Sequence, residues 1–390
     1  MDLIPYSRQS INEEDISLVT KTLSSNFLTQ GPRVPEFERS LESKMGVNYA
    51  IVCSSGTAAL HLAYASAGIN EKSLGIVPAI TFAATANALR YQGAEVLFCD
   101  VEPESGLISV SSLEECISNI TDEQKENLNL IAPVSFAGSV APLISCKEIA
   151  DKNNFVLMED ASHSPGAWKY DQSDEKMYSA NGKHALASTL SFHPVKHICA
   201  GEGGAVLTND EELAQKASQL RSHGIKRPFN EDDDMPWYYE QEALGWNYRL
   251  TDLQAALGLS QLARIEQFLM KRRALAKRYN QILSQSPFKE HINCPPFEDG
   301  HAWHLYIIRF LDHNLRNQAY KFFKNNNILT QIHYIPVYKH PYYKKHRKNY
   351  SLPGAEAFYQ GCLSIPMFPD LNEAEQDRVL ETLETFLTKG

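Results

Sequence analysis

Short apolar runs alternate with amphipathic stretches over the first 220 residues of the chain. The runs are apolar at successive positions, which is typical of strands buried on both faces of a sheet. They are AIVC (50–53), GIVP (75–78), EVLFCD (95–100), LIAPVSF (130–136), FVLMED (155–160), STLSF (188–192) and GAVLTND (204–210). Helical spacing appears between them at 57–68, 81–93, 110–120 and 147–153. This alternation predicts an α/β fold with a mostly parallel sheet covered by helices.

Further helices are predicted on either side of this region. Residues 12–24, with Asn12 as N-cap, and residues 34–45 are amphipathic. A helix over 210–222 is expected to begin at Asn209, because Glu212 follows the cap by three residues. A long helical stretch covers about 251–285.

The pattern changes in the last third of the chain and predicts a smaller α+β domain. Its expected strands are AWHLYIIRF (302–310), ILTQIHYIPV (328–337) and CLSIPMF (362–368), with helices at 313–326 and 372–389. A chain of 390 residues favours two domains, here 1–250 and 251–390. The polar segments 170–187 and 226–241 are interpreted as surface loops.

Composition narrows the class of protein. The chain is 43% hydrophobic and 22% charged, with a net charge of −10, so neither nucleic acid nor an anionic membrane is expected as a partner. Seven scattered cysteines without a CxxC pair indicate reduced thiols and a cytoplasmic protein. The N-terminus does not resemble a signal peptide, and no apolar run is long enough for a membrane span.

Three segments carry candidate chemistry. In CSSGTAALHLA, Ser55, Gly56 and Thr57 precede a helix whose N-terminus could bind a phosphate, although they could equally be plain caps. Asp160 ends an apolar strand, where a ligand or solvent could meet it. Lys196 lies between a strand and a glycine-rich turn, and could be a nucleophile or a surface lysine.

Together these segments fit a pyridoxal 5'-phosphate (PLP) site. A helix N-terminus would bind the phosphate, Asp160 would pair with the ring nitrogen, and Lys196 would form a Schiff base with the aldehyde. Phe82 could cover the ring.

The whole chain resembles the DegT/DnrJ/EryC1/StrS sugar-nucleotide aminotransferases, which have a PLP-dependent, aspartate-aminotransferase-like fold (type I). The motifs that carry the resemblance are LTQGPRVPEFE, SSGTAALHLA, EDASHSPGA, SFHPVKHICAGEGGAVLTND, RSHGI, WNYRLTDLQAALGLSQL, WHLYIIR, IHYIPVY and SIPMFP. The forms IPYSRQSINEEDI, SFHPVK and HYIPVY are most similar to a branch that acts in pseudaminic acid biosynthesis.

The resemblance implies a set of site residues. Lys196 is the implied catalytic, Schiff-base lysine. The implied cofactor-binding residues are Ser55, Gly56, Thr57, Phe82, Asp160, His163, Ser191, Lys196 and Asn247. The implied sugar-nucleotide contacts are Tyr6, Asn26, Phe27, Leu28, Thr29, Ile332, His333, Tyr334 and Ile335. Asn247 would reach the phosphate of the partner subunit's cofactor, which implies a homodimer with shared active sites.

The implied reaction is transamination at C4 of a UDP-linked 2-acetamido-4-keto-6-deoxy-L-hexose, with glutamate as the amino donor. Three alternatives stay open. The sugar could be another keto sugar nucleotide of the perosamine, bacillosamine, legionaminic acid or 3-amino type. A PLP-fold dehydratase would carry a histidine in place of Lys196, and a regulator would need a DNA-binding domain. The histidine spacing does not predict a metal site.

Overall fold

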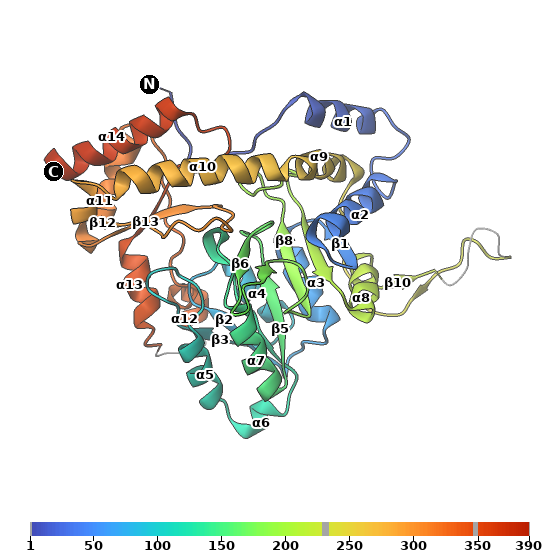
Figure 1. Cartoon of the computed structure of the whole chain (residues 1–390). Helices are drawn as coiled ribbons and strands as arrows, with labels where there is room; N and C mark the ends of the chain where they lie inside the picture. Colours follow the sequence, from blue (N-terminus) through green and yellow to red (C-terminus); the bar gives the residue numbers. More distant parts are fainter. Residues whose placement is uncertain (1, 228–233, 346–349, 390) are drawn as a thin grey trace.

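The computed structural model describes residues 2–227, 234–345 and 350–389 (Figure 1). Within these ranges, seven strands form the main sheet in the order β1-β9-β8-β5-β4-β2-β3. β9 is antiparallel to both of its neighbours, and the other neighbouring pairs are parallel. The strands are β1 (Tyr49–Cys53), β2 (Leu74–Pro78), β3 (Glu95–Cys99), β4 (Asn129–Ile131), β5 (Phe155–Asp160), β8 (Ala187–Ser191) and β9 (Gly204–Thr208).

Helices cover both faces of this sheet, and successive strand residues face opposite layers. In β1, Ile51 packs with α3 and α4, whereas Val52 packs with α2 and α9. α8 lies on the side of α3, and α5 and α7 lie on the opposite side. The helices are α1 (Glu13–Leu23), α2 (Arg33–Met45), α3 (Gly56–Ser66), α4 (Ala83–Tyr91), α5 (Val110–Ser118), α6 (Asp122–Lys125), α7 (Leu143–Asn153), α8 (Glu211–Arg221) and α9 (Asp252–Ala263).

A smaller antiparallel sheet forms the C-terminal part, with strand order β12-β13-β14. Ile4 bridges to Ile328, so the first residues of the chain also pack here. Figure 1 shows α10 crossing the upper part of the molecule, below α14. The elements are α10 (Ile265–Leu283), β12 (Ile292–Asn293), β13 (Tyr306–Phe310), α11 (His313–Asn325), α12 (Pro341–Lys344), α13 (Pro353–Gly361), β14 (Cys362–Ile365) and α14 (Glu373–Lys389), with 3₁₀ turns at Phe288–Glu290 and Val337–Lys339. A further 3₁₀ turn, Phe136–Gly138, follows β4 of the main sheet.

The predicted fold class is confirmed, because a large, mostly parallel sheet is joined to a smaller α+β part. The division of the chain into 1–250 and 251–390 stays a prediction. Among the helices of the described residues, none has both the length and the apolar character that crossing a membrane requires.

Several predicted strands are shorter than expected, and prolines explain two of these cases. β4 ends at Ile131, two residues before Pro133, and β14 ends at Ile365, before Pro366. Proline has no N–H to donate to a sheet. β13 begins only at Tyr306, because residues 302–305 bond to the backbone of Ala137 and Gly138 instead.

The predicted strand over 328–337 is wrong. Only isolated bridges form there, from Ile328 to Ile4 and from Gln331 to Ser364. The chain then leaves the small sheet, and the Val337 N–H donates to the Ala79 carbonyl, just after β2 of the large sheet, at 2.9 Å. This segment therefore crosses between the two sheets instead of extending one of them.

Two helix predictions also need correction. The N-cap of α8 is Asp210, whose Oδ1 accepts from the Leu213 N–H at 2.7 Å. The predicted cap, Asn209, instead accepts from the Asn48 N–H at 2.8 Å. The stretch 251–285 is two helices, α9 and α10, which are separated at Arg264.

The two predicted surface loops have different outcomes. Residues 228–233 of the segment 226–241 lie outside the described residues, and its ends form the short pair β10 (Ile225–Lys226) and β11 (Glu240–Gln241). The segment 170–187 begins in an exposed hairpin of β6 (Trp168–Tyr170) and β7 (Lys176–Tyr178). The surface prediction fails beyond β7, because Ser179 and Ala180 are buried against Glu159.

Candidate active site

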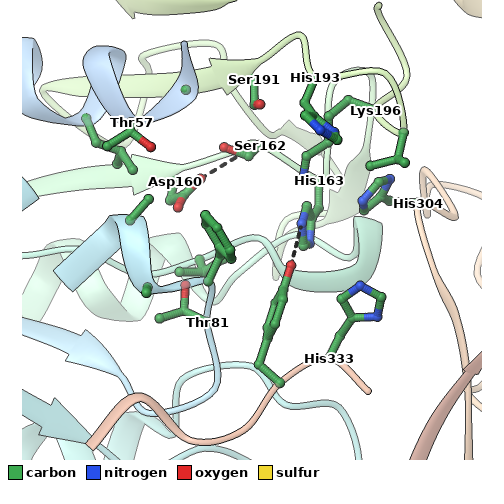
Figure 2. A pocket seen from close by; sticks show the side chains of 18 of the residues that line it. Thr57, Thr81, Asp160, Ser162, His163, Ser191, His193, Lys196, His304 and His333 are labelled. Carbon is green, nitrogen blue, oxygen red and sulfur yellow. Dashed lines mark hydrogen bonds between the residues drawn. The ribbon is translucent and has the colours of Figure 1, made fainter. Parts of the chain in front are cut away.

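A cavity of about 710 Å³ lies at the carboxyl ends of β1, β5 and β8. Loops that follow parallel strands meet at this edge of a sheet, which is where ligands bind in open α/β folds. Figure 2 shows Thr57, Asp160, Ser191 and Lys196 around this space. The predicted residues that line it are Tyr6, Ser55, Gly56, Thr57, Phe82, Asp160, His163, Ser191, Lys196, Ile332, His333, Tyr334 and Ile335.

The N-terminus of α3 forms an anion-binding corner of the cavity. Ser55 is the N-cap, and its Oγ accepts from the Ala58 N–H at 3.0 Å. A Cβ on Gly56 would lie 2.8 Å from the Ser191 Cβ, so Ser191 lies directly against the start of the helix. The first N–H groups of a helix point outward and carry partial positive charge. Together with the Ser191 hydroxyl, they suit a phosphate.

Asp160 is a buried carboxylate at the end of β5. Its Oδ2 accepts from Thr85 Oγ1 at 2.7 Å, and its Oδ1 accepts from the Ser162 N–H at 3.1 Å. Since Thr85 donates to Asp160, it accepts from Thr81 Oγ1, 2.8 Å away. These bonds fix the carboxylate, which can pair with a cationic group in the cavity.

The neighbouring Glu159 faces the other side of the sheet. Its carboxylate accepts from Ser135, Ser179 and Ser188 hydroxyls at 2.5, 2.5 and 2.9 Å, and from the Ala180 N–H at 2.9 Å. Successive strand residues point to opposite faces. Of the two adjacent acids, only Asp160 therefore lines the cavity, and Glu159 joins the segment after β7 to the sheet.

Lys196 ends a tight turn after β8. Its backbone N–H donates to the His193 carbonyl at 2.8 Å, and Ser7 Oγ donates to the Val195 carbonyl at 3.4 Å. Burial lowers the pKa of the Lys196 amine to about 7, although the Asp160 carboxylate opposes the shift. Near neutral pH a large share of this amine is unprotonated, so it can attack a carbonyl or accept a proton.

His163 is a buried, neutral imidazole at the lysine end of the cavity. Its Nδ1 accepts from the Ala137 N–H at 3.3 Å, so the proton lies on Nε2, which is 3.4 Å from Tyr334 Oη. Burial, and secondarily the charge of Lys196, holds the pKa of His163 well below its ordinary value. The ring can therefore pack against a planar ligand without carrying charge.

Aromatic side chains form the outer wall. Phe82 is 59% exposed, and its ring centroid lies 6.0 Å from that of Tyr334. The Tyr6 and His333 rings are 5.6 Å apart, and His333 Nδ1 lies 2.8 Å from Ser364 Oγ. This wall offers apolar faces and hydroxyl groups, which suits a sugar.

Two predicted groups do not line the cavity of this chain. Asn26, Phe27, Leu28 and Thr29 lie beside the start of α9, where the Leu28 carbonyl accepts from the Asp252 N–H at 2.9 Å. Phe27 and Leu28 are 52% and 45% exposed. Asn247 is also exposed and pairs with Ser222 at an isolated bridge.

Other lining residues had no role assigned from the sequence. His304 is buried with its ring 4.3 Å from that of His163, and it belongs to the motif WHLYIIR. Thr81 also lines the cavity, and it reaches Asp160 through Thr85. The motif alone pointed to His304, whereas the threonine chain depends on contacts between distant segments. Over the residues that the structure describes, His, Cys, Asp and Glu side chains form no group that could hold a metal ion.

Comparison with known proteins places this chain in a family. Residues 9–384 match the DegT/DnrJ/EryC1/StrS aminotransferase family. The chain is 37% identical over 389 residues to the UDP-4-amino-4,6-dideoxy-N-acetyl-beta-L-altrosamine transaminase of Campylobacter jejuni, covering 99% of this chain and 98% of that one. It is 34% identical to the spore coat polysaccharide biosynthesis protein SpsC of Bacillus subtilis, covering 99% and 97%.

Solved structures agree with the sequence comparison. Helicobacter pylori PseC, an aminotransferase involved in pseudaminic acid biosynthesis, matches with a TM-score of 0.89, 30% identity and full coverage of both chains. The PMP form of the sugar aminotransferase Spr1654 from Streptococcus pneumoniae matches with a TM-score of 0.89 and 26% identity over 99% of each chain. Spr1654 also has a PLP form, and PLP dependence is typical of the family. The chain therefore belongs to the DegT/DnrJ/EryC1/StrS aminotransferase family.

Proposed function

We propose that the protein is a PLP-dependent aminotransferase acting at C4 of a UDP-linked 2-acetamido-4-keto-6-deoxy-L-hexose, with glutamate as amino donor, in pseudaminic acid biosynthesis. One observation carries the chemistry: the Lys196 amine, with a pKa near 7, lines the same cavity as the Asp160 carboxylate and the N-terminus of α3. The identity to the altrosamine transaminase supports the choice of sugar.

The residues present fit PLP. The helix start at Ser55, Gly56 and Thr57, together with Ser191, would bind the phosphate. Asp160 would pair with the ring nitrogen, and His163 and Phe82 would lie against the ring. When bound, PLP supplies an electron sink for bond changes at the carbon that bears the amine.

Lys196 would have two roles in turnover. Its Nζ would hold the cofactor covalently between reactions. Once an amino donor displaces it, the unprotonated Lys196 amine would take the proton from the Cα of the donor. It would then deliver this proton to C4′, the cofactor carbon to which Lys196 had been bound. Asp160 would keep the ring nitrogen protonated, because its carboxylate is fixed by Thr85 and the Ser162 N–H.

The active unit would be a homodimer. Residues 26–29 and Asn247 do not line the cavity of their own chain. Large exposed apolar side chains lie within or near these segments in the sequence: Phe27, Leu28, Trp237, Tyr239 and Leu244. Covering such residues with a second copy removes apolar surface from water. In this arrangement Asn247 would reach the partner's cofactor phosphate, and Asn26 to Thr29 would contact the partner's sugar nucleotide.

Sugar selection would depend on the outer wall. Tyr6, His333 and Tyr334 would present ring faces and hydrogen-bonding groups to the sugar. A site built to bond a given hydroxyl rejects a wrong epimer, because its own polar groups are then left unpaired.

The experiment is a panel of UDP- and GDP-linked 4-keto sugars, each incubated with ¹⁵N-labelled glutamate and the purified protein with PLP. We expect mass spectrometry to find ¹⁵N in the UDP-linked L-sugar product. For the D-epimer at C5, kcat/KM should be lower than for the L-sugar by roughly tenfold or more. Lys196→Ala is the inactive control. Equal or better use of the D-epimer would refute the sugar assignment and leave the transamination intact, whereas absence of ¹⁵N from every product would refute both.

A further inference from the structure

His61 lies in the second turn of α3, behind the helix start that forms the anion-binding corner. It is buried, and its ring centroid is 4.2 Å from that of Trp246. Its Nδ1 is 3.2 Å from Tyr248 Oη. Burial lowers the pKa of His61 to about 4, so the imidazole is neutral at physiological pH. The proposed reaction gives this residue no role.

Trp246 and Tyr248 belong to an extended segment between the end of α8 and the loop after β1. The Trp246 N–H donates to the Leu220 carbonyl at 2.7 Å, and the Tyr248 N–H donates to the Arg221 carbonyl at 3.0 Å. The Ser54 N–H donates to the Tyr248 carbonyl at 2.8 Å. The segment is thus bonded both to the end of α8 and to Ser54, the residue before the N-cap of α3.

Asn247 lies between these two aromatic residues. The Trp246 and Tyr248 rings stack 5.5 Å apart with only 12° between their planes, so both side chains are on one side of the segment. Side chains alternate in extended chain, so Asn247 is on the other side, and it is exposed. Whatever fixes the two rings therefore also fixes the direction of Asn247.

We propose that His61 is a positioning residue for Asn247, acting through the rings of Trp246 and Tyr248. The inference rests on the proposed function, in which Asn247 binds the phosphate of the partner subunit's cofactor. It has a specific consequence: substitution of His61 in one subunit weakens cofactor binding in the site of the other subunit.

Leucine at position 61 would remove both contacts. Tyr248 Oη would lose its buried hydrogen-bond partner, and Trp246 would lose one of its ring contacts and keep the stack with Tyr248. The segment 246–248 would still be bonded through its backbone, so the loss would fall on the orientation of Asn247. A merely structural role for His61 would instead disturb α3, whose N-terminus binds the phosphate of its own subunit.

Mixed dimers separate these two roles. Two differently tagged subunits are co-expressed: a reporter subunit that keeps Lys196, and a silent subunit with Lys196→Ala. The visible absorbance of PLP bound to lysine then reports one site per dimer. His61→Leu is placed either in the reporter or in the silent subunit, and the PLP dissociation constant is measured by titration of the cofactor-free dimers.

We expect His61→Leu in the silent subunit to raise the dissociation constant of the reporter site by about fivefold, the size expected when one hydrogen bond to a charged group is loosened. In the reporter subunit the same change should raise it by less than about twofold. A larger effect in the reporter subunit, or equal effects in both, would overturn the inference.

Two further variants keep the test decisive. Tyr248→Phe removes only a hydroxyl and should give the same asymmetry with a smaller amplitude, even if His61→Leu fails to fold. Asn247→Ala in the same two arrangements tests the proposed function itself. If it acts on its own subunit's site, the crossing of Asn247 is wrong and this inference falls with it. If it acts on the partner's site while Tyr248→Phe and His61→Leu do not, only the role of His61 is refuted.

Discussion

Lys196 and Asp160 show how burial, and not residue type alone, produces the chemistry of this site. A lysine in water is almost wholly protonated at neutral pH, but desolvation disfavours the charged form. Asp160 opposes that effect and so sets how far the pKa of Lys196 can fall. Both side chains line one cavity, which makes their charges interdependent.

The first prediction concerns the pH dependence of Lys196. In the cofactor-free protein its acetylation by trace acetic anhydride should rise with an inflection near pH 7, because burial lowers the amine pKa to about 7. Asp160→Asn should move the inflection to lower pH, since it removes the charge that favours the protonated amine. Peptide mass spectrometry measures both, with exposed lysines of the same digest as reference. An inflection near pH 10 would contradict the prediction.

Asp160→Asn should also reduce kcat about a hundredfold or more, equivalent to roughly 2.7 kcal/mol of barrier. The amide has nearly the same shape but cannot keep a ring nitrogen protonated. Steady-state kinetics with saturating PLP measures the effect. The matched control is Asp100→Asn, another buried carboxylate, which accepts from the Gly354 and Ala355 N–H groups outside the cavity and should affect stability more than kcat. A loss below about tenfold in Asp160→Asn would mean a different role.

At the scale of elements, α3 and the ends of β8 and β9 form one unit. The start of the helix packs against Ser191 at the end of β8 and against Gly204 at the start of β9. These close approaches hold the first N–H groups of α3 in place. The anion-binding corner is therefore a property of three elements together and not of the helix alone.

Gly204→Ala should weaken PLP binding. Its Cβ would lie 2.4 Å from the Ser55 carbonyl oxygen, so the backbone at the helix start must move. Such overpacking costs on the order of 1–3 kcal/mol, here expected in the binding free energy of PLP. Titration of the cofactor-free protein with PLP measures it. Gly203→Ala is the control, because its Cβ would meet only side chains of Phe192 and Leu250, at 3.1 and 3.2 Å. Equal losses in both variants would contradict the argument.

At the scale of the whole molecule, one chain contains only part of the predicted site. Asn247 and residues 26–29 are exposed outside their own cavity, and exposed apolar side chains lie within or next to these segments in the sequence, such as Phe27 and Leu244. A second copy of the chain would cover the exposed apolar side chains and would bring Asn247 and residues 26–29 to its own cavity. The dimer would then be required for catalysis and not only for stability.

Mixed dimers of a Lys196→Ala subunit and an Asn247→Ala subunit should be more active than either mutant homodimer. If the sites are shared as proposed, one of the two sites in such a heterodimer would contain Lys196 from one subunit and Asn247 from the other, and would be complete. Tandem-tag purification and transamination assays of the three dimers measure the rescue. If heterodimers form but are no more active than the Asn247→Ala homodimer, the site is not shared.

The local pattern of the sequence determined most of the fold and the main candidates of the site. Runs of apolar residues marked β1, β2, β3, β5, β8 and β9, because strands buried on both faces need apolar side chains at successive positions. The order of motifs, with a helix start, a strand-end acid and a lysine before glycines, pointed to the cavity before any contact was known.

Tertiary structure decided which residues of these motifs face one another. Glu159 and Asp160 are equivalent in the sequence, but the pleat of β5 turns only Asp160 toward the cavity. The apolar segment 328–337 has the composition of a strand, yet it meets β14 only at Gln331 and then crosses toward the large sheet, where the Val337 N–H donates to the Ala79 carbonyl. Partners of this kind are set by contacts between distant parts of the chain. Local periodicity fixes which side of an element is buried, but not what it is buried against.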